Sequence, residues 1–170
     1  MLSPIYQENF PYIAPVQIDG PTRFNLLAVW ACHAKENSYE AKRGPLRRAI
    51  SAYQAFIECG PTVVAGDFND NVKWDKPTKI NKHATNVSML TALGLRSAYH
   101  YSRSVDQGRE MEPTLYWRDR KSDGLSYHID YCFIPDAWTK SISAVTVGNF
   151  DDWVGRGLSD HVPLVVEVNP

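Results

Sequence analysis

The stretch TVVAGDFN, residues 62–69, joins a short β-branched run to a polar turn. Its first four residues predict a buried strand, because β-branched side chains fit a pleated and packed surface. Gly66 ends that strand, since glycine allows a sharp change of chain direction. Asp67 and Asn69 lie two residues apart and can face one side, while Phe68 packs the other way. A carboxylate beside a carboxamide offers an acceptor for a proton or metal and a donor for a developing anion. The tetrapeptide alone also fits an ordinary Asx-rich turn.

The residues before this stretch predict a strand and a helix. FNLLAVWA, residues 24–31, is almost continuously apolar, as is typical of a strand that is buried on both faces. Residues 46–59 carry apolar side chains at helical spacing between two glycine–proline pairs, which indicates one amphipathic helix. Residues 1–22 hold four prolines and are expected to form an extended lead-in.

The residues after it predict a second helix and then mostly strands. Thr85 or Asn86 is expected to cap the helix. Strands are expected at 97–101, 114–117, 127–134, 142–147 and 162–168, with a short helical turn at 135–140. This order favours an α/β domain built from sheet and helix layers. No linker-like segment divides the chain, so a single domain over residues 1–170 is predicted.

Composition limits the function classes. The net charge is −1, so a nucleic-acid substrate would need a local basic patch rather than a global positive field. The three cysteines, Cys32, Cys59 and Cys132, show no CxxC spacing, which favours free thiols in a reducing compartment over disulfides or structural zinc. No apolar run approaches the ~20 residues of a membrane span. The first residues lack the pattern of a signal peptide, so a cytoplasmic location is expected.

Two further motifs place titratable side chains where apolar strands are predicted. In YHIDY, residues 127–131, Asp130 lies in an apolar run, where a carboxylate is costly unless it is paired. Its partner is either a structural arginine or amide, or a histidine that the carboxylate would orient. In SDHVPL, residues 159–164, Asp160 and His161 precede the closing strand and supply such a histidine. Taken alone, this motif also fits ordinary turn chemistry.

The motifs together are more specific than each alone. GDFN at 66–69, HIDY at 128–131 and SDHVPL at 159–164 follow one another in this order. The chain resembles the endonuclease/exonuclease/phosphatase superfamily over residues 22–168. That superfamily includes deoxyribonuclease I, exonuclease III, AP endonucleases and sphingomyelinases. His33, which follows the apolar run at 24–31, is similar to a histidine of that family.

The resemblance implies a fold and a reaction. The fold would be a four-layered α/β/β/α sandwich of the deoxyribonuclease I type, and the reaction would be metal-assisted hydrolysis of a phosphoester by water. His161 would act as general base or phosphate contact, oriented by Asp130. His33 would contact the phosphate or protonate the leaving group. Asp67 and Asn69 would position the water and the phosphoryl oxygens, and the resemblance leaves open whether Asp67 or His161 activates the water.

The resemblance also implies a cofactor. Asp160, Asp67 and Asn69 would hold Mg²⁺ or Mn²⁺, because hard cations prefer oxygen ligands and keep several waters. Family members have a main metal ligand, a glutamate in an xQE segment. Tyr6-Gln7-Glu8 matches that pattern, but no buried strand precedes it, and we interpret it as a chance match.

The chain is therefore similar to the C-terminal portion of such a domain, and N-terminal truncation is expected. Weak or absent activity of the isolated chain is the consequence. Truncation would leave apolar sheet surface uncovered, which favours a homo-oligomer or a partner chain.

Substrate choice is the least determined feature of the sequence. Arg47 and Arg48 could contact phosphates, although a solvated helix start explains them as well. Trp74 lies in a predicted loop and could stack on a base or pack inside the fold. Nucleic acid is modestly favoured over lipid or inositol phosphates. Two alternatives to an enzyme of this family stay open: a non-catalytic binding module, or a thiol hydrolase that uses Cys32 or Cys132 with His161 and Asp130.

Overall fold

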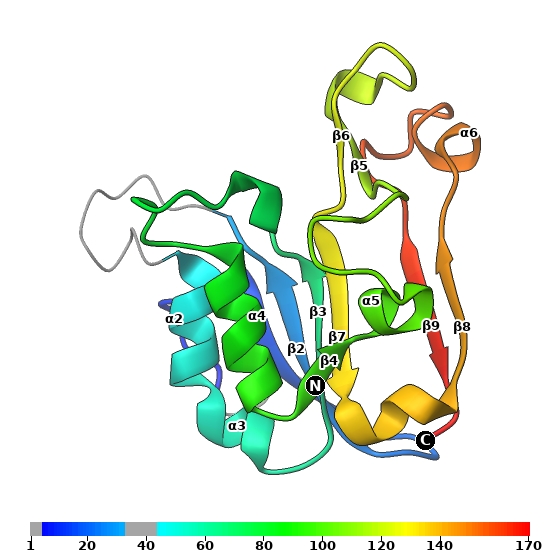
Figure 1. Cartoon of the computed structure of the whole chain (residues 1–170). Helices are drawn as coiled ribbons and strands as arrows, with labels where there is room; N and C mark the ends of the chain where they lie inside the picture. The colour runs from blue at the N-terminus through cyan, green and yellow to red at the C-terminus, as the bar shows by residue number, and fades with distance from the viewer. Residues whose placement is uncertain (1–4, 33–43) are drawn as a thin grey trace.

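A computed structural model describes residues 5–32 and 44–170 of the chain. Its main feature is a five-stranded sheet (Figure 1). The strands lie in the order β1 (Ile13–Ile18), β2 (Phe24–Trp30), β3 (Thr62–Asp67), β7 (Asp130–Pro135) and β4 (Leu95–Ser97).

The pairing of the central strands brings distant motifs to one edge of this sheet. β2 and β3 are parallel, and their last residues, Trp30 and Asp67, lie side by side. β7 runs antiparallel to β3 and begins at Asp130, which lies opposite Asp67. Two strands that end and one that begins therefore meet at the upper end of the sheet in Figure 1.

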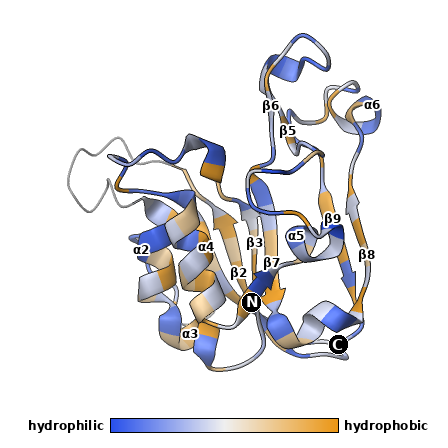
Figure 2. Ribbon diagram, viewed as in Figure 1, coloured by the Kyte–Doolittle hydropathy of each residue, from blue (hydrophilic) through white to orange (hydrophobic). Residues whose placement is uncertain are grey.

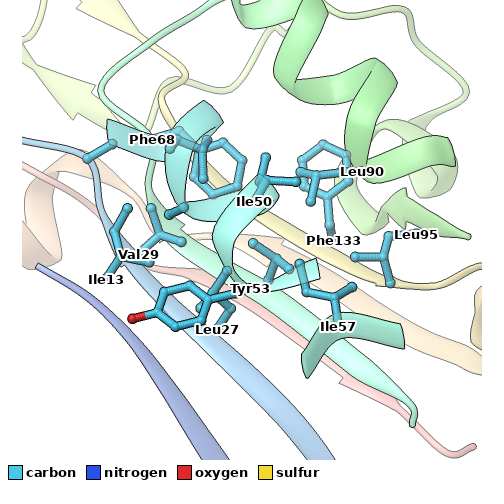
Figure 3. Packing of buried hydrophobic residues seen from close by; sticks show 14 of the residues in the cluster. Ile13, Leu27, Val29, Ile50, Tyr53, Ile57, Phe68, Leu90, Leu95 and Phe133 are labelled. Atoms are coloured by element: carbon cyan, nitrogen blue, oxygen red, sulfur yellow. The ribbon is translucent and has the colours of Figure 1, made fainter. Parts of the chain in front are cut away.

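Three helices cover one face of the sheet and form the main core with it. They are α2 (Pro45–Ala52), α3 (Gln54–Glu58) and α4 (His83–Ala92). Figure 3 shows how Leu27 of β2 packs near Tyr53 and how Phe133 of β7 packs near Leu90. Each fully buried side chain of this size contributes about 1.5–3 kcal/mol to folding. The sheet is thus anchored from its helical face.

The opposite side is built around a hairpin of β8 (Ile142–Val147) and β9 (Leu164–Val168), which packs with α5 (Ala98–Arg103) in a second, smaller core. Short elements complete this half of the molecule. They are η1 (Val72–Trp74), β5 (Leu115–Tyr116), η2 (Trp117–Asp119), β6 (Ser126–Tyr127), η3 (Asp136–Ser141) and α6 (Phe150–Trp153).

An apolar cleft separates the main sheet from the β8–β9 hairpin. One part has a volume of about 570 Å³ and is lined by Leu26, Ala65 and Val166. A second part, of about 700 Å³, continues past Val63 and Trp138. Figure 2 shows hydrophobic colouring along the strands on both sides and hydrophilic colouring in the hairpin of β5 and β6. The expected uncovered apolar surface is therefore present, and which molecule covers it stays a prediction.

The structure confirms the mixed α/β fold class and most of the predicted strands, but it corrects several boundaries. The helix predicted over 46–59 is two helices that meet at Tyr53. Residues 97–101 are not a strand, because β4 ends at Ser97 and α5 follows. The lead-in over 1–22 contains β1, which pairs with β2 along its full length.

The predicted cap of the second helix is also wrong. α4 begins at His83, and its first backbone N–H groups donate to a side chain that lies outside the helix. The carboxylate of Asp75 accepts from the N–H groups of His83 and Ala84 at 2.8 and 2.9 Å. This carboxylate satisfies two of the orphan donors that every helix start leaves. In the part of the chain that the structure describes, no helix has the length and hydropathy needed to cross a membrane.

Candidate active site

The turn after β3 orients Asp67 and Asn69 toward each other. Oδ1 of Asp67 accepts from the backbone N–H of Asn69 at 2.7 Å, and Oδ2 accepts from its Nδ2 at 2.8 Å. Asn69 adopts a left-handed conformation with φ of 49°, which asparagine tolerates better than most residues. The carboxylate and the carboxamide are thus locked as one unit at the end of the strand.

Gly66 makes this turn possible. Its φ is +132°, and a Cβ at this position would lie 2.0 Å from the carbonyl oxygen of Val29 on the neighbouring strand. β2 and β3 can therefore approach closely just before Asp67 only because residue 66 has no side chain.

Asp130 and His161 form the second pair of the site. Nδ1 of His161 lies 2.8 Å from Oδ2 of Asp130, and the two side chains are 27% and 19% exposed. Because an ionised carboxylate only accepts, Nδ1 carries the proton in this contact. Nε2 is then left to exchange a proton or to contact a substrate, as in other carboxylate–histidine pairs.

A buried threonine holds the two strands of this pair in place. The hydroxyl of Thr114, which is fully buried, accepts from the backbone N–H groups of Ile129 and Asp130 at 3.1 Å each. Its carbonyl accepts from the N–H of Val162 at 2.8 Å. Leu115 next to it forms a bridge with His161. Thr114 therefore fixes the distance between the Asp130 and His161 segments, a role that its sequence context did not indicate.

The surroundings of Asp67 disfavour its negative charge. The pKa of Asp67 is raised to about 6, first by burial and also by the nearby carboxylates of Asp130 and Asp160, while the hydrogen bond from the Asn69 backbone and the nearby His161 lower it. At neutral pH this carboxylate is ionised in an unfavourable setting. A cation bound there would relieve the repulsion.

The pKa of His161 is raised, first by its hydrogen bond with Asp130 and against the opposing effect of burial. A histidine whose pKa is raised by folding contributes stability below its unfolded pKa and loses that contribution as pH rises through the folded pKa.

Replacing Asp130 with asparagine is expected to lower the pKa of His161 below its value in the unmodified chain. The amide keeps the size of the carboxylate but loses the charge that favours the imidazolium. The measurement is an NMR titration of the His161 ring protons in both proteins. The control is Asp136→Asn, which removes a carboxylate just past the other end of β7 and should leave the titration unchanged. An unchanged pKa in Asp130→Asn would contradict the pairing.

The polar side chains of the site suit a cation that keeps most of its bound waters better than a cation that is coordinated by protein atoms alone. Among the described residues, no group of three His, Cys, Asp or Glu side chains is arranged to hold a metal ion. Mg²⁺ is usually held by one or two carboxylates and keeps several waters. Asp67 and Asn69 suit that pattern, whereas Asp160 is exposed and lines a separate depression with Arg118 and Gly157.

The remaining predicted site residues are His33, Arg47, Arg48 and Trp74. His33 is outside the described residues. Arg47 and Arg48 lie on α2, where Arg47 donates to the carbonyl of Ile80 at 3.3 Å and Arg48 lies over the ring of Phe10. Both arginines thus have structural partners away from the Asp67 turn. Trp74 belongs to η1 and packs edge-on against Tyr127, in a second pocket at the same end of the sheet.

The xQE match and the thiols do not join the site. Glu8 is exposed in a turn before β1, consistent with a chance match. Burial raises the pKa of Cys132 to about 12, and burial also raises that of Cys32. Thiols with raised pKa values are poor nucleophiles, which disfavours the thiol hydrolase alternative.

A buried polar network behind the motifs was missed by the sequence analysis. Nδ2 of Asn71 donates to the carbonyl of His128 at 2.9 Å and lies 3.1 Å from the hydroxyl of Tyr131. The Tyr131 hydroxyl is also 3.3 Å from the carbonyl of Asp70. These contacts tie the loop after GDFN to the HIDY strand. In the sequence, only the second Asp-Asn pair of GDFNDN, Asp70-Asn71, could have indicated these contacts.

Comparisons with known proteins give the class of the fold. The 3′ phosphatase NExo from Neisseria, solved bound to product DNA hairpin, matches with a TM-score of 0.68 and 15% identity. The match covers 93% of this chain and 65% of the NExo chain. An AP endonuclease from Leishmania major matches with a TM-score of 0.64 and 9% identity, over 94% of this chain and 55% of that chain. A protein from Beutenbergia cavernae, described as endonuclease/exonuclease/phosphatase, has a TM-score of 0.59 and 22% identity, over 91% and 38%.

The chain therefore has the fold of the endonuclease/exonuclease/phosphatase proteins, as the motifs predicted. No protein-family model matches the sequence, and no curated protein matches it. The chain spans about two thirds or less of the length of these structural neighbours. The likeness is one of fold, and activity, substrate and partners are taken up as proposals.

Proposed function

We propose that this chain carries the Asp, Asn and His part of a metal-dependent phosphoester hydrolase site. The observation that supports it is the convergence of two hydrogen-bonded pairs, Asp67 with Asn69 and Asp130 with His161, at one end of the sheet. The first pair ends a strand and the second joins a strand start to the SDHVPL segment. Rigid strand ends hold reacting groups better than mobile loops do.

Each side chain has a role that its chemistry suits. His161, held by Asp130, exchanges a proton with the attacking water or contacts the phosphoryl group, since an oriented imidazole works near neutral pH. Asp67 accepts a hydrogen bond from the water and orients it. The amide of Asn69 donates to a phosphoryl oxygen as negative charge develops there.

A divalent cation, Mg²⁺ or Mn²⁺, would be held by Asp67 and Asn69 with help from Asp160. When bound, such an ion neutralises charge on the phosphate and lowers the pKa of a bound water. The raised pKa of Asp67 supports this assignment, because a nearby cation would favour the ionised carboxylate.

Nucleic acid is the substrate class that we favour. The Neisseria neighbour was solved with a DNA product, and its fold is shared over most of this chain. Trp74 and Tyr127 lie at the same end of the sheet as the site and offer aromatic surface to a base. The alternative is a non-catalytic binding module of the same fold, which the lack of a three-ligand cluster among the described residues favours.

The purified chain is expected to hydrolyse bis-p-nitrophenyl phosphate slowly with Mg²⁺ or Mn²⁺ and not at all with excess EDTA. A low rate is expected because the chain spans only part of its neighbours. Isothermal titration with each metal runs in parallel. An equal rate in EDTA would rule out the metal-dependent reaction, and absence of both metal binding and hydrolysis would favour the binding module.

A further inference from the structure

A second pocket, of about 250 Å³, opens beside the HIDY strand and outside the catalytic pairs. Its walls come from the loop after β3, the loop before β5, and β6. We call it the acceptor pocket and define it by Asn71, Lys73, Trp74, Glu110, Tyr127 and His128.

Glu110 is a buried carboxylate with one unused oxygen. Its side chain is 1% exposed. Oε1 accepts from Nε2 of His100 at 3.0 Å and from the backbone N–H of Gly108 at 2.8 Å. Burial alone would raise the pKa of Glu110, but its hydrogen bonds outweigh burial and lower the pKa to about 2. Oε2 has no hydrogen-bond partner, and the nearest ammonium group, on Lys73, is 4.0 Å away.

His128 adds a second unused acceptor. The residue is 4% exposed, and its Nδ1 lies 2.7 Å from the carbonyl oxygen of Glu112. A carbonyl only accepts, so Nδ1 carries the proton and Nε2 presents its lone pair. Burial lowers the pKa of His128, which favours this neutral form. Nε2 is buried and has no partner.

Two buried acceptors that receive no hydrogen bond destabilise the folded chain unless a donor reaches them. A metal ion does not fill this role. The ammonium group of Lys73 already lies near Glu110, and among the described residues no three side chains are arranged to hold a metal ion. The ring of Trp74 packs edge-on against that of Tyr127, with centroids 4.8 Å apart. A pocket that combines buried hydrogen-bond acceptors with aromatic rings suits a flat ring that carries an amino group.

We propose that the acceptor pocket binds a nucleobase with an exocyclic amino group, adenine, cytosine or guanine, next to the scissile phosphate. This inference rests on the proposed action on nucleic acid. The amino group donates to Oε2 of Glu110 and Nε2 of His128, while the base lies against Trp74 and Tyr127. Thymine presents a carbonyl oxygen at the corresponding position, which two acceptors repel.

The test is binding of the four deoxynucleoside 5′-monophosphates in EDTA, measured by calorimetry or by NMR shifts of the His128 ring. The adenine, cytosine and guanine nucleotides are expected to bind about tenfold more tightly than the thymine nucleotide, as one good base contact provides. Equal affinity for all four, or no binding at millimolar concentration, would overturn the proposal and leave the pocket to water.

Glu110→Gln sharpens this test. The amide oxygen keeps the donors from His100 and Gly108, so the NH₂ group takes the place of Oε2 and turns an acceptor into a donor. The preference should then shift from the three bases that carry an amino group toward thymine. Glu58→Gln, an exposed change on α3, is the matched control and should keep the original preference. A folded Glu110→Gln protein, checked by circular dichroism, that retains the original preference would contradict the assigned contact.

Trp74→Ala is a second variant that does not alter the buried network. It should weaken binding of all bases alike and leave the order of preference unchanged, because stacking is tolerant of base identity. A selective loss for adenine alone would contradict the geometry. Since these measurements use EDTA and no reaction, they test the pocket separately from hydrolysis of bis-p-nitrophenyl phosphate, which carries no base.

Discussion

Replacing His161 with asparagine is expected to lower the metal-dependent rate of phosphodiester hydrolysis by about 10²–10⁴-fold relative to the unmodified chain. Asparagine can keep one hydrogen bond to Asp130 but cannot exchange a proton near neutral pH. The measurement is the initial rate on bis-p-nitrophenyl phosphate at saturating Mg²⁺ or Mn²⁺, corrected for the rate in EDTA.

The control for His161→Asn is Asp136→Asn. Asp136 forms an exposed ion pair with Arg96 at the far end of β7, so its loss should cost little stability and no activity. Both proteins should give the circular dichroism spectrum of the unmodified chain. A rate for His161→Asn within threefold of the unmodified chain would mean that His161 is not a reacting group.

β2 and β3 could be predicted because their apolar runs are continuous, although only one face of each is buried and the other is half-buried at the cleft. FNLLAVW became β2 and TVVAGD became β3, with Leu27 and Val64 in the helical core and Leu26 and Ala65 at the cleft. A strand that is apolar on both faces stands out in the sequence, so the local pattern is sufficient.

Short elements could not be predicted because tertiary contacts decide them. Residues 98–101 carry the β-favouring aromatics Tyr99 and Tyr101, yet they belong to α5, at whose start the Ser97 hydroxyl lies 2.7 Å from Nδ1 of His100. The buried face of α5 packs on β7 and β8, which outweighs local strand propensity.

The four side chains of the two hydrogen-bonded pairs were among the predicted site residues, but the groups that hold them in place were not predicted. Motifs show which side chains carry chemistry, whereas the groups that hold them are distant in the chain and chemically ordinary. Thr114 is one such group, because its hydroxyl holds the Asp130 segment while nothing in EPTLYW marks it. The Asn71 amide is another, reaching His128 and Tyr131 across more than fifty residues. Long-range hydrogen bonds of this kind leave no repeating pattern in the sequence.

Replacing Gly66 with alanine is expected to destabilise the protein by about 2–6 kcal/mol, the largest stability effect that we predict. A non-glycine residue at this positive φ costs about 1–3 kcal/mol. Overpacking adds about 1–3 kcal/mol. The new methyl group would lie 2.0 Å from the Val29 carbonyl oxygen, which is backbone and cannot swing away. The measurement is urea unfolding followed by circular dichroism.

Gly94→Ala separates the two contributions to this cost. Gly94 also has a positive φ, of +77°, but a Cβ there would meet nothing within 4 Å. It therefore carries the backbone cost without the clash, and its destabilisation should be the smaller by about 1–3 kcal/mol. Equal losses for both variants would show that β2 and β3 can separate freely at Gly66. That separation would also release Asp67 from Trp30, its neighbour on β2, so the position of Asp67 and the stability of the sheet depend on the same close approach.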